Sequence, residues 1–376
     1  MDKADLNSDL IIIGAGPAGC VAATVLARAA FNVVLIEQSR FPRDKVCGEC
    51  LSALGIDVIS RCDLRDVIQQ HHPIPLERSC LYAADGTRVE VRLPRPMWGL
   101  SREVMDTTLL STAKVAGVHI RQPSRAEKII PGSPPRVLVR DLQSNEIQEF
   151  AAGLVLLADG KGSVGQRRQA TGDLGVKCHL TGVDAPADAI ELFGMNGHYA
   201  GLAPIEGNRW NLAFSVPAKR VAQLRGDMDQ LLTQMKAENE SFREQLQFSK
   251  RASDWLTCPL PRFGVASAWE ENVIPLGNAS AALEPIGGEG MGLAMASAEL
   301  ATGKIITART LGRSVDTAGL QREFHALWNV RRLACRATAI ALSNPIIAPY
   351  ALQFFGDLRM LHEPAMRMLG KIAIRS

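Results

Sequence analysis

Short apolar runs separated by helical segments dominate the first part of the chain. Leu10 to Ile13 and Val33 to Ile36 are continuous apolar runs, the pattern expected of parallel strands buried on both faces. The segment between them, from Cys20 to Arg28, is rich in small residues and predicts a helix. Apolar runs of the same kind recur at 154–158 and 273–276. The pattern predicts a parallel α/β sheet built from segments that are far apart in the sequence.

The middle of the chain loses this rhythm and predicts antiparallel strands. Residues 79–93 predict a hairpin with its turn at Asp85-Gly86. Residues 197–214 predict two strands joined by a Gly-Asn turn, and 221–246 predict a helix. The predicted division assigns 1–76, 99–176 and 263–320 to a nucleotide-binding domain, 77–98 and 177–262 to an inserted substrate domain, and 321–376 to a C-terminal helical segment.

A glycine motif lies at the turn between the first predicted strand and its helix. Gly14, Gly16 and Gly19 form G-x-G-x-x-G, with Pro17 and Ala18 before the last glycine. Gly14 permits the tight turn, Gly16 lets a pyrophosphate approach the backbone, and Gly19 lets helix and strand pack closely. The helix N-terminus supplies free N–H groups and the positive end of its dipole.

An acidic residue ends the second predicted strand. Glu37 lies 18 residues beyond Gly19 and is followed by Gln38. A carboxylate there accepts hydrogen bonds from an adenosine ribose, and it repels a 2′-phosphate, which favours NAD or FAD over NADP at this site. Strand, turn, helix, second strand and acid occur in the required order, so we predict a dinucleotide site.

Composition and charge narrow the classes of partner. The 376-residue chain has a net charge of +3, too small to suggest nucleic-acid binding. Residues 1–8 are polar and lack the apolar region of a secretory signal, and no apolar run approaches the roughly 18 residues of a membrane span. The eight irregularly spaced cysteines are expected to be reduced thiols. We expect a cytoplasmic protein without a membrane span.

Basic residues gather in two places, and each has two interpretations. Arg40, Arg43 and Lys45 could reach a pyrophosphate or form a solvated loop. From 331 to 376 there are seven Lys or Arg residues against two Asp or Glu. This segment is compatible with peripheral membrane contact or with a helical bundle that has a solvated basic face.

Several separated segments together resemble the FAD-dependent monooxygenase superfamily of the para-hydroxybenzoate hydroxylase fold. Within it, the chain is most similar to the geranylgeranyl-reductase-like and polyketide-tailoring branch. The matching segments are Gly14 to Gly19 with Glu37, Phe41 to Glu49, Arg102 to Asp106, Asp159-Gly160, His198 to Pro204, and Gly277-Asn278 through Ala298. The resemblance implies an α/β fold with an FAD-binding Rossmann-like (GR2-type) domain, an inserted antiparallel-sheet substrate domain and a C-terminal helical segment.

The resemblance also implies residue roles. The residues expected to contact FAD are Gly14, Gly16, Pro17, Ala18, Gly19, Glu37, Gln38, Arg43, Lys45, Cys47, Arg102, Ala126, Asp159, Gly277, Asn278, Gly288, Gly290, Met291 and Gly292. Cys47 and Glu49 are near-flavin candidates, with a structural role as the alternative, and no catalytic acid or base is assigned. His198 and Tyr199 could line the substrate side or form a core pair. NADH or NADPH is the expected transient electron donor, and no metal is expected.

Two positions depart from the family pattern. Asn278 stands where the family usually has Asp; it can accept a ribityl hydroxyl but loses a charge-assisted bond. Gln166 stands where an Arg usually follows the Asp-Gly motif, and Arg167 is shifted by one position. Trp210 stands alone, without the Trp-x-Trp-x-Ile-Pro signature, so halogenation is disfavoured.

Three functional hypotheses follow from the resemblance. In the first, NAD(P)H reduces the flavin, and a flavin C4a-hydroperoxide hydroxylates or epoxidises an apolar or aromatic, polyketide-like substrate. In the second, which the loop from Lys45 to Gly48 favours, the enzyme reduces prenyl or polyene double bonds. In the third, Asn278 and Gln166 mark a degenerate FAD-fold binding protein.

Overall fold

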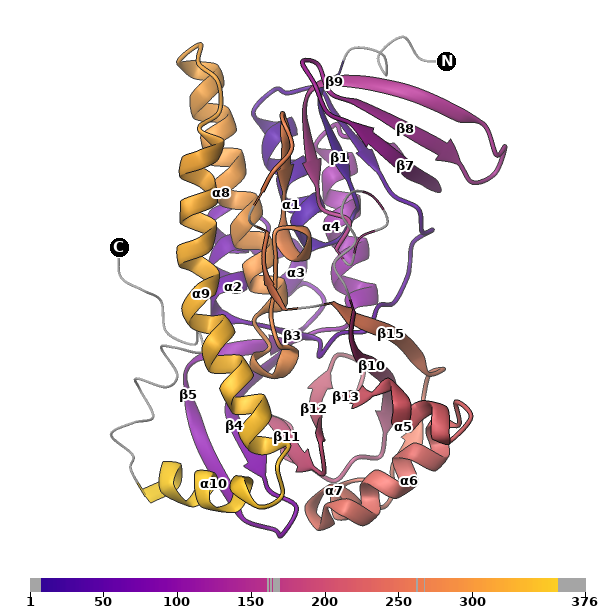
Figure 1. Cartoon of the computed structure of the whole chain (residues 1–376), viewed down its shortest axis with the longest axis vertical. Coiled ribbons are helices and arrows are strands. Elements are labelled where there is room, and N and C mark those ends of the chain that lie inside the picture. Colours follow the sequence, from indigo (N-terminus) through magenta and orange to yellow (C-terminus); the bar gives the residue numbers. More distant parts are fainter. Residues whose placement is uncertain are drawn as a thin grey trace.

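Two sheets organise the chain, one above the other in Figure 1. The structure is a computed structural model that describes residues 8–160, 162, 164, 170–261, 263–266 and 268–357. Gln166 and Arg167, which bear on the second departure from the family pattern, lie outside the described residues.

The first sheet is parallel at its centre, as the apolar runs predict. β1 pairs with β2 on one side and β9 on the other; β6 adds to β2, and β17 adds to β9. β8 and β7 continue beyond β9 in antiparallel pairing. Ile11 and Ile12 on β1 are fully buried. The bounds are β1 Ser8–Ile13, β2 Val33–Ile36, β6 His119–Arg121, β7 Ser124–Ile130, β8 Arg136–Asp141, β9 Ile147–Leu157 and β17 Val273–Pro275.

Helices α1, α4 and α8 pack together beside this sheet, and α2 packs on α8. Two close approaches depend on glycine. A Cβ on Gly19 in α1 would lie 1.8 Å from the carbonyl oxygen of Gly14, and one on Gly292 in α8 would lie 2.2 Å from Ser52 Oγ. The bounds are α1 Pro17–Arg28, α2 Ala53–Arg61, α3 Arg65–Gln69, α4 Arg102–Val115 and α8 Gly290–Thr310. Ser101 is the N-cap of α4, and its Oγ accepts a hydrogen bond from the Val104 amide.

The second sheet combines two separated parts of the chain. Its order is β14-β10-β13-β12-β11-β4-β5-β3, with β15 beside β10. The pairs are antiparallel except β4 with β11, which is parallel. The sheet is therefore mixed, whereas the sequence predicted an antiparallel sheet. The bounds are β3 Cys50–Leu51, β4 Ile74–Tyr82, β5 Arg88–Gly99, β10 Ala170–Thr181, β11 Ala189–Met195, β12 His198–Ile205, β13 Arg209–Pro217, β14 Lys250–Arg251 and β15 Leu256–Pro261. The predicted domain boundaries stay a prediction.

The helical segment predicted at 221–246 is divided into three helices, α5 Ala218–Gln223, α6 Met228–Glu238 and α7 Glu240–Gln245. Two side chains cap the N-termini of α6 and α7. Asp227 accepts a hydrogen bond from the Gln230 amide, and Asn239 accepts one from the Phe242 amide. Asp and Asn compete for backbone donors in this way, which favours them at helix starts over helix interiors.

A long helix, α9 (Thr317–Leu342), runs from beside the first sheet down to the second (Figure 1). α10 (Ile347–Asp357) lies across the lower part of the β4–β5 hairpin in Figure 1 and contacts β5. A Cβ on Gly194 in β11 would lie 2.2 Å from the Leu342 carbonyl oxygen, so the end of α9 packs directly on the second sheet. Among the described residues, no helix is both long and apolar enough to cross a membrane.

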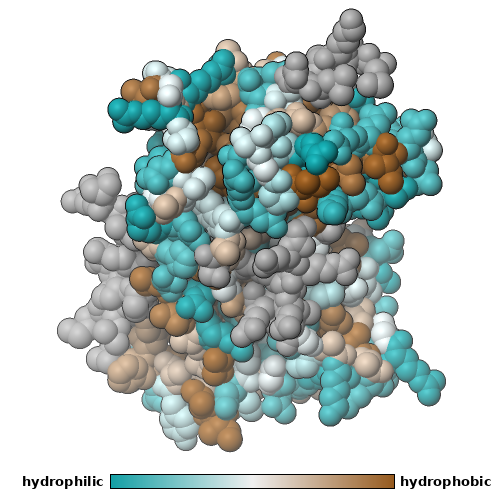
Figure 2. Space-filling model, turned by 45° about the horizontal axis from the view of Figure 1, so that its top comes forward, coloured by the Kyte–Doolittle hydropathy of each residue, from teal (hydrophilic) through white to brown (hydrophobic). Residues whose placement is uncertain are grey.

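One face of the molecule (Figure 2) is mostly polar, and the cysteines are not paired with one another. The face seen in Figure 2 is largely hydrophilic, with separate hydrophobic patches. On α9 and the chain that follows it, Leu333, Ile346 and Tyr350 are 65%, 76% and 73% exposed; peripheral membrane contact stays a prediction. All eight cysteines lie among the described residues and none forms a disulfide there.

Candidate functional site

A cavity of about 830 Å³ lies between the two sheets and is partly open to solvent. Its wall takes in the N-termini of α1 and α8 together with the loop 44–50. The wall continues along the faces of β11 and β12 to α9 and α10. This volume falls in the upper part of the range usual for small-molecule sites, about 300–1,000 Å³. The first part of the wall is the cofactor end, and the part under α9 and α10 is called the apolar pouch below.

Two helix N-termini open into the cofactor end. The N-cap of α1 is Gly16 and that of α8 is Glu289, and neither makes a side-chain capping bond. A Cβ added to Gly16 or Gly290 would meet no described atom within 4 Å. Free first-turn N–H groups beside open space form a site suited to negatively charged ligand groups.

Glu37 lines the cofactor end at the carboxyl end of β2 and is 4% exposed. Its Oε2 accepts a hydrogen bond from the Ala15 amide at 2.8 Å, and its Oε1 accepts one from the Ser39 amide at 2.7 Å. A carboxylate can accept about four hydrogen bonds. Glu37 therefore ties the end of β2 to the glycine turn and retains capacity to accept a bond from a ligand.

Arg102 brings a buried positive charge to the cavity wall from the first turn of α4. Its guanidinium bonds both oxygens of Asp106, at 2.9 and 2.6 Å. Burial acts to lower the pKa of Arg102, but attraction to Asp106 and the hydrogen bonds they share outweigh it, so that the pKa is raised. The same Asp106 accepts a bond from Arg43 at 2.8 Å. Arg43 and Arg102 therefore share one carboxylate, and Arg43 helps to hold Asp106 in place beside Arg102.

Most of the residues predicted to hold a cofactor lie in one wall. The cavity is lined by Gly14, Gly16, Pro17, Ala18, Glu37, Gln38, Lys45, Cys47, Arg102, Ala126, Asp159, Gly277, Asn278, Gly288, Gly290 and Met291. Gly19, Arg43 and Gly292 lie behind the wall, since the two glycines serve helix packing and Arg43 serves Asp106. The direct phosphate contact expected of Arg43 therefore has no support from its position.

Of the two residues predicted to line the substrate side, Tyr199 faces the cavity and His198 does not. Tyr199 lines the apolar pouch. His198 is outside the wall formed by the described residues: its Nδ1 lies 3.0 Å from the Asn196 carbonyl oxygen and its Nε2 lies 3.9 Å from a Glu238 carboxylate oxygen. Burial lowers the pKa of His198. Adjacent strand residues point to opposite faces, so both could not face the cavity.

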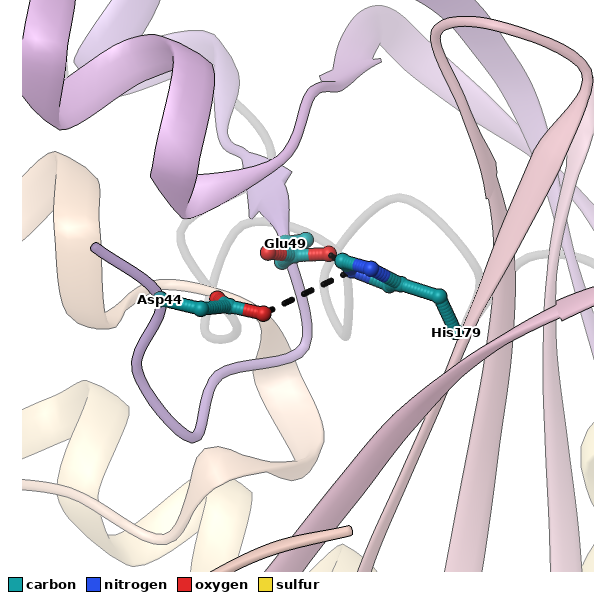
Figure 3. Close-up of side chains that lie close together, drawn as sticks. All are labelled: Asp44, Glu49 and His179. Carbon is teal, nitrogen blue, oxygen red and sulfur yellow. Dashed lines mark hydrogen bonds and ion pairs between the residues drawn. The ribbon is translucent and has the colours of Figure 1, made fainter. Parts of the chain in front are cut away.

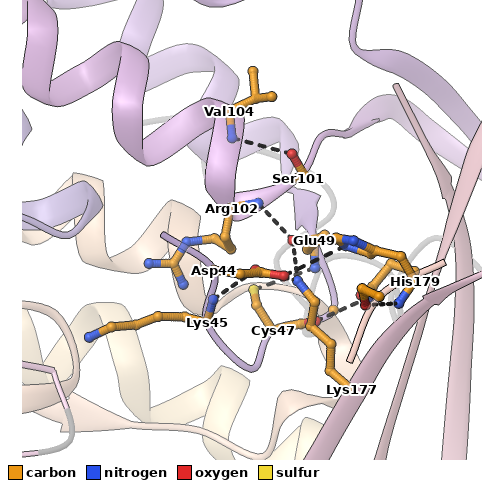
Figure 4. A network of polar contacts seen from close by, with 12 residues as sticks. Asp44, Lys45, Cys47, Glu49, Ser101, Arg102, Val104, Lys177 and His179 are labelled. Atoms are coloured by element: carbon orange, nitrogen blue, oxygen red, sulfur yellow. Dashed lines mark hydrogen bonds and ion pairs between the residues drawn. The ribbon is translucent and has the colours of Figure 1, made fainter. Parts of the chain in front are cut away.

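A cluster of buried charges holds the loop 44–50 against the second sheet (Figures 3 and 4). The Lys177 ammonium lies 2.5 Å from Asp44 Oδ1 and 2.5 Å from Glu49 Oε1. His179 Nε2 lies 2.7 Å from Glu49 Oε2. Glu49 Oε1 also accepts a bond from the Arg102 amide at 2.7 Å. Lys177 and Glu49 have fully buried side chains, so this group, the Lys177 cluster, links β10, the loop and α4.

The Lys177 cluster holds the backbone of the loop in an uncommon conformation at Glu49. Glu49 has φ +56°, a conformation that costs free energy in a residue other than glycine. Asn211 on β13, which pairs directly opposite His179, donates a bond to the Cys47 carbonyl oxygen at 3.1 Å. Cys47, Gly48 and Glu49 all line the cavity. The second sheet therefore sets the position of the loop that faces the cofactor end.

Asp44, Glu49 and His179 also resemble a metal-binding group, with one ligand atom from each within 4.8 Å of the others. Lys177 argues against that use, because its ammonium already lies at hydrogen-bond distance from both carboxylates. A divalent cation would have to displace a buried lysine. The arrangement is that of an internal ion-pair cluster.

Comparison with known proteins identifies the family. A family profile described as "FAD binding domain" matches residues 7–310. The chain belongs to this family. It is 25% identical over 355 residues to a menaquinone reductase of Mycobacterium tuberculosis, covering 89% of this chain and 85% of that protein. It is 25% identical over 310 residues to squalene monooxygenase of Rattus norvegicus, covering 77% of this chain and 53% of that protein.

Solved structures show the same fold. The flavin-dependent brominase Bmp2 superposes with a TM-score of 0.83 at 17% sequence identity, over 98% of this chain and 94% of that one. The predicted fold class is confirmed, and this protein is an FAD-dependent oxidoreductase of the monooxygenase superfamily. FAD is its cofactor.

The cofactor end fits FAD. We expect the pyrophosphate at the N-terminus of α1, where Gly16 leaves open space, and the flavin near the N-terminus of α8. The dipole of α8 would stabilise negative charge on a reduced flavin. Asn278 lines the same wall, so it remains within reach of a ribityl hydroxyl. Lys45, also in the wall, has a lowered pKa because of burial and the nearby Arg43 and Arg102; a bound phosphate would offset both effects.

The sequence patterns do not single out Asp44, Lys177 or His179. They do not single out Glu284 either, a buried acidic residue that also lines the cavity. A signal for two of them existed. Lys177 and His179 alternate with Val176, Cys178 and Leu180 in one strand, and charged residues that alternate with buried apolar ones indicate either a solvated face or a buried polar contact. The contact itself depends on the packing of the second sheet against a distant loop.

A change at Glu37 tests the cofactor end. We expect Glu37→Gln to lower the free energy of unfolding by about 1–3 kcal/mol, because an amide turned toward Ala15 or Ser39 places a donor against a buried donor. FAD affinity should fall at the same time. Chemical denaturation and FAD titration measure the two effects. The control is Glu146→Gln, the same substitution at an exposed residue that does not line the cavity. Unchanged stability would contradict the role assigned to Glu37.

Proposed function

We propose that this protein is an NAD(P)H-dependent FAD monooxygenase that hydroxylates or epoxidises an elongated apolar or aromatic substrate. The observation that carries the proposal is the continuity of the cavity. The cofactor end passes without a break into a pouch lined by Leu81, Leu93, Ile190, Leu192, Leu342 and Leu352. A substrate in the pouch would have one end beside the flavin.

The chemistry required of the protein is limited. Bound FAD, reduced by NAD(P)H, supplies oxygen activation. The remaining tasks are to orient the substrate and exclude water, and the buried aliphatic pouch suits both. The similarity to a protein named squalene monooxygenase supports this reaction class.

A second candidate is reduction of a double bond in a prenyl or polyene chain. The loop from Lys45 to Gly48, whose sequence favours this reaction by resemblance, lines the cavity. A protein named menaquinone reductase aligns with 89% of this chain. The third hypothesis, a degenerate binding protein, is not retained, because the relatives named as reductases and monooxygenases are enzymes.

Oxygen distinguishes the two candidates. We expect the holo-protein with NADH or NADPH to consume oxygen in step with product formation from farnesol, squalene or 2-naphthol. Product formation should stop under anaerobic conditions. The measurement combines an oxygen electrode with chromatography and mass spectrometry of the products. Saturated product formed without oxygen would overturn the monooxygenase proposal and establish the reductase.

A further inference from the structure

The apolar pouch contains one buried acidic group beside a hydroxyl. Tyr199 on β12 and Glu284 both line the cavity, and they are 6% and 4% exposed. The Tyr199 hydroxyl donates a hydrogen bond to Glu284 Oε1 at 2.9 Å. Burial and the neighbouring Glu284 raise the pKa of Tyr199 well above its usual value, so the hydroxyl keeps its proton and remains a donor.

Glu284 is held from the opposite side by a cation. Arg336 on α9 donates a hydrogen bond to Glu284 Oε2 at 2.7 Å, and more than half of the Arg336 side chain is exposed. Arg336 thus reaches the carboxylate from the solvent side while Tyr199 holds it from the sheet. The two partners fix the carboxylate in orientation and leave it facing the cavity.

The position of Glu284 relates it to the cofactor. Glu284 directly precedes the short helix η3 (Pro285–Gly287) and Gly288, which line the cavity on the way to the N-terminus of α8. The surroundings of Tyr199 are apolar, including Ile286, Ala339 and Leu342 of the same core cluster. The carboxylate therefore lies where the pouch meets the predicted flavin position.

We infer that Glu284, oriented by Tyr199 and Arg336, is the recognition point for a hydroxyl group at the flavin-facing end of an otherwise apolar substrate. A carboxylate accepts about four hydrogen bonds and donates none, and its two bonds to described residues leave capacity toward the cavity. The matching ligand group is an alcohol or phenol. A carboxylate-bearing ligand would place two anions together in a buried site and is excluded.

This inference rests on the proposed function only for the statement that the pouch holds the substrate. It applies equally to a monooxygenase and a double-bond reductase. A binding measurement on the oxidised holo-protein, made without NAD(P)H, therefore tests it separately from turnover.

The experiment compares matched probes by their perturbation of the flavin absorbance spectrum. The probes are farnesol with farnesyl methyl ether and farnesoic acid, and 2-naphthol with 2-methoxynaphthalene. We expect at least one alcohol to bind about 10-fold or more tightly than its ether, because a hydrogen bond to a charged group is lost in the ether. Farnesoic acid should bind more weakly than farnesol.

Two variants separate recognition from a purely structural role. Glu284→Gln keeps the volume but removes the charge, and we expect the preference for alcohol over ether to fall to about threefold or less. Thr338→Val is the matched control: Thr338 also lines the pouch, but its hydroxyl bonds to the Ala334 carbonyl within α9, so the preference should be retained.

Three results would overturn the inference: equal binding of alcohol and ether in both pairs, tight binding of farnesoic acid, or a full alcohol preference in Glu284→Gln. Failure of every probe to perturb the spectrum also counts against it. If Glu284→Gln does not retain FAD, the binding of alcohol, ether and acid probes to the unmodified protein decides whether the inference holds.

Discussion

Gly16→Val is expected to weaken FAD binding by at least about 100-fold, which corresponds to about 2.7 kcal/mol. Gly16 is the N-cap of α1, and no described atom lies within 4 Å of the position that its Cβ would take. A valine side chain would fit the protein alone but would fill the space through which a pyrophosphate reaches the first-turn amides. The fold should therefore persist while the cofactor is lost.

Gly303→Val is the matched control for this change. Gly303 lies in α8, its Cβ would also meet no described atom within 4 Å, and it is not part of the cavity wall formed by the described residues. The control should change only helix propensity, in favour of the helix and by tenths of a kcal/mol, and keep its flavin. Flavin absorbance after gel filtration measures retention. Stoichiometric FAD in Gly16→Val would show that the pyrophosphate lies elsewhere.

Lys177→Met is expected to lower the free energy of unfolding by about 3–5 kcal/mol, because it leaves Asp44 and Glu49 close together without their shared cation. Lys177 has a fully buried side chain and bonds both carboxylates. Protonation of either carboxylate would relieve their repulsion. The deficit relative to the unmodified protein should therefore be largest at neutral and alkaline pH and should shrink as the pH falls.

The removal of a second charge tests the same cluster. In Lys177→Met combined with Glu49→Gln, part of the lost stability should return, since only Asp44 remains charged. Lys128→Met, which changes an exposed lysine on β7, is the control and should alter stability by less than about 0.5 kcal/mol. Denaturant unfolding across a pH series gives the free energy of unfolding of the unmodified protein and of the three variants. A deficit that is independent of pH would contradict the ion-pair account.

The sequence predicted the first sheet well, because that sheet depends on local patterns. The residues predicted to contact FAD stay a prediction, although most of them lie in one cavity wall. The apolar runs at β1, β2, β9 and β17 need no tertiary information. The glycine turn carries its own geometric requirement: a Cβ on Gly14 would lie 2.5 Å from the Ala158 carbonyl oxygen, and Gly14 has φ +101°. The sequence also predicted an acidic residue at the end of the second strand, and Glu37 directly follows β2.

The features that were missed depend on contacts between distant segments. The Lys177 cluster joins positions 44 and 49 to 177 and 179 through the packing of β10 on a loop. No local pattern encodes that register. The parallel pairing of β4 with β11 likewise depends on how two separated segments meet. The separation of His198 from Tyr199 follows from strand alternation once the cavity side is known, and the sequence alone does not give that side.

The absorbance spectrum of the purified protein, titrated with farnesol, tests the central claim that FAD and an apolar substrate share one cavity. The account predicts a yellow protein with stoichiometric FAD, and a saturable change in the flavin bands as farnesol is added, because the pouch opens onto the flavin. A protein that stays colourless after incubation with FAD, or a flavin spectrum that farnesol leaves unchanged, would contradict it.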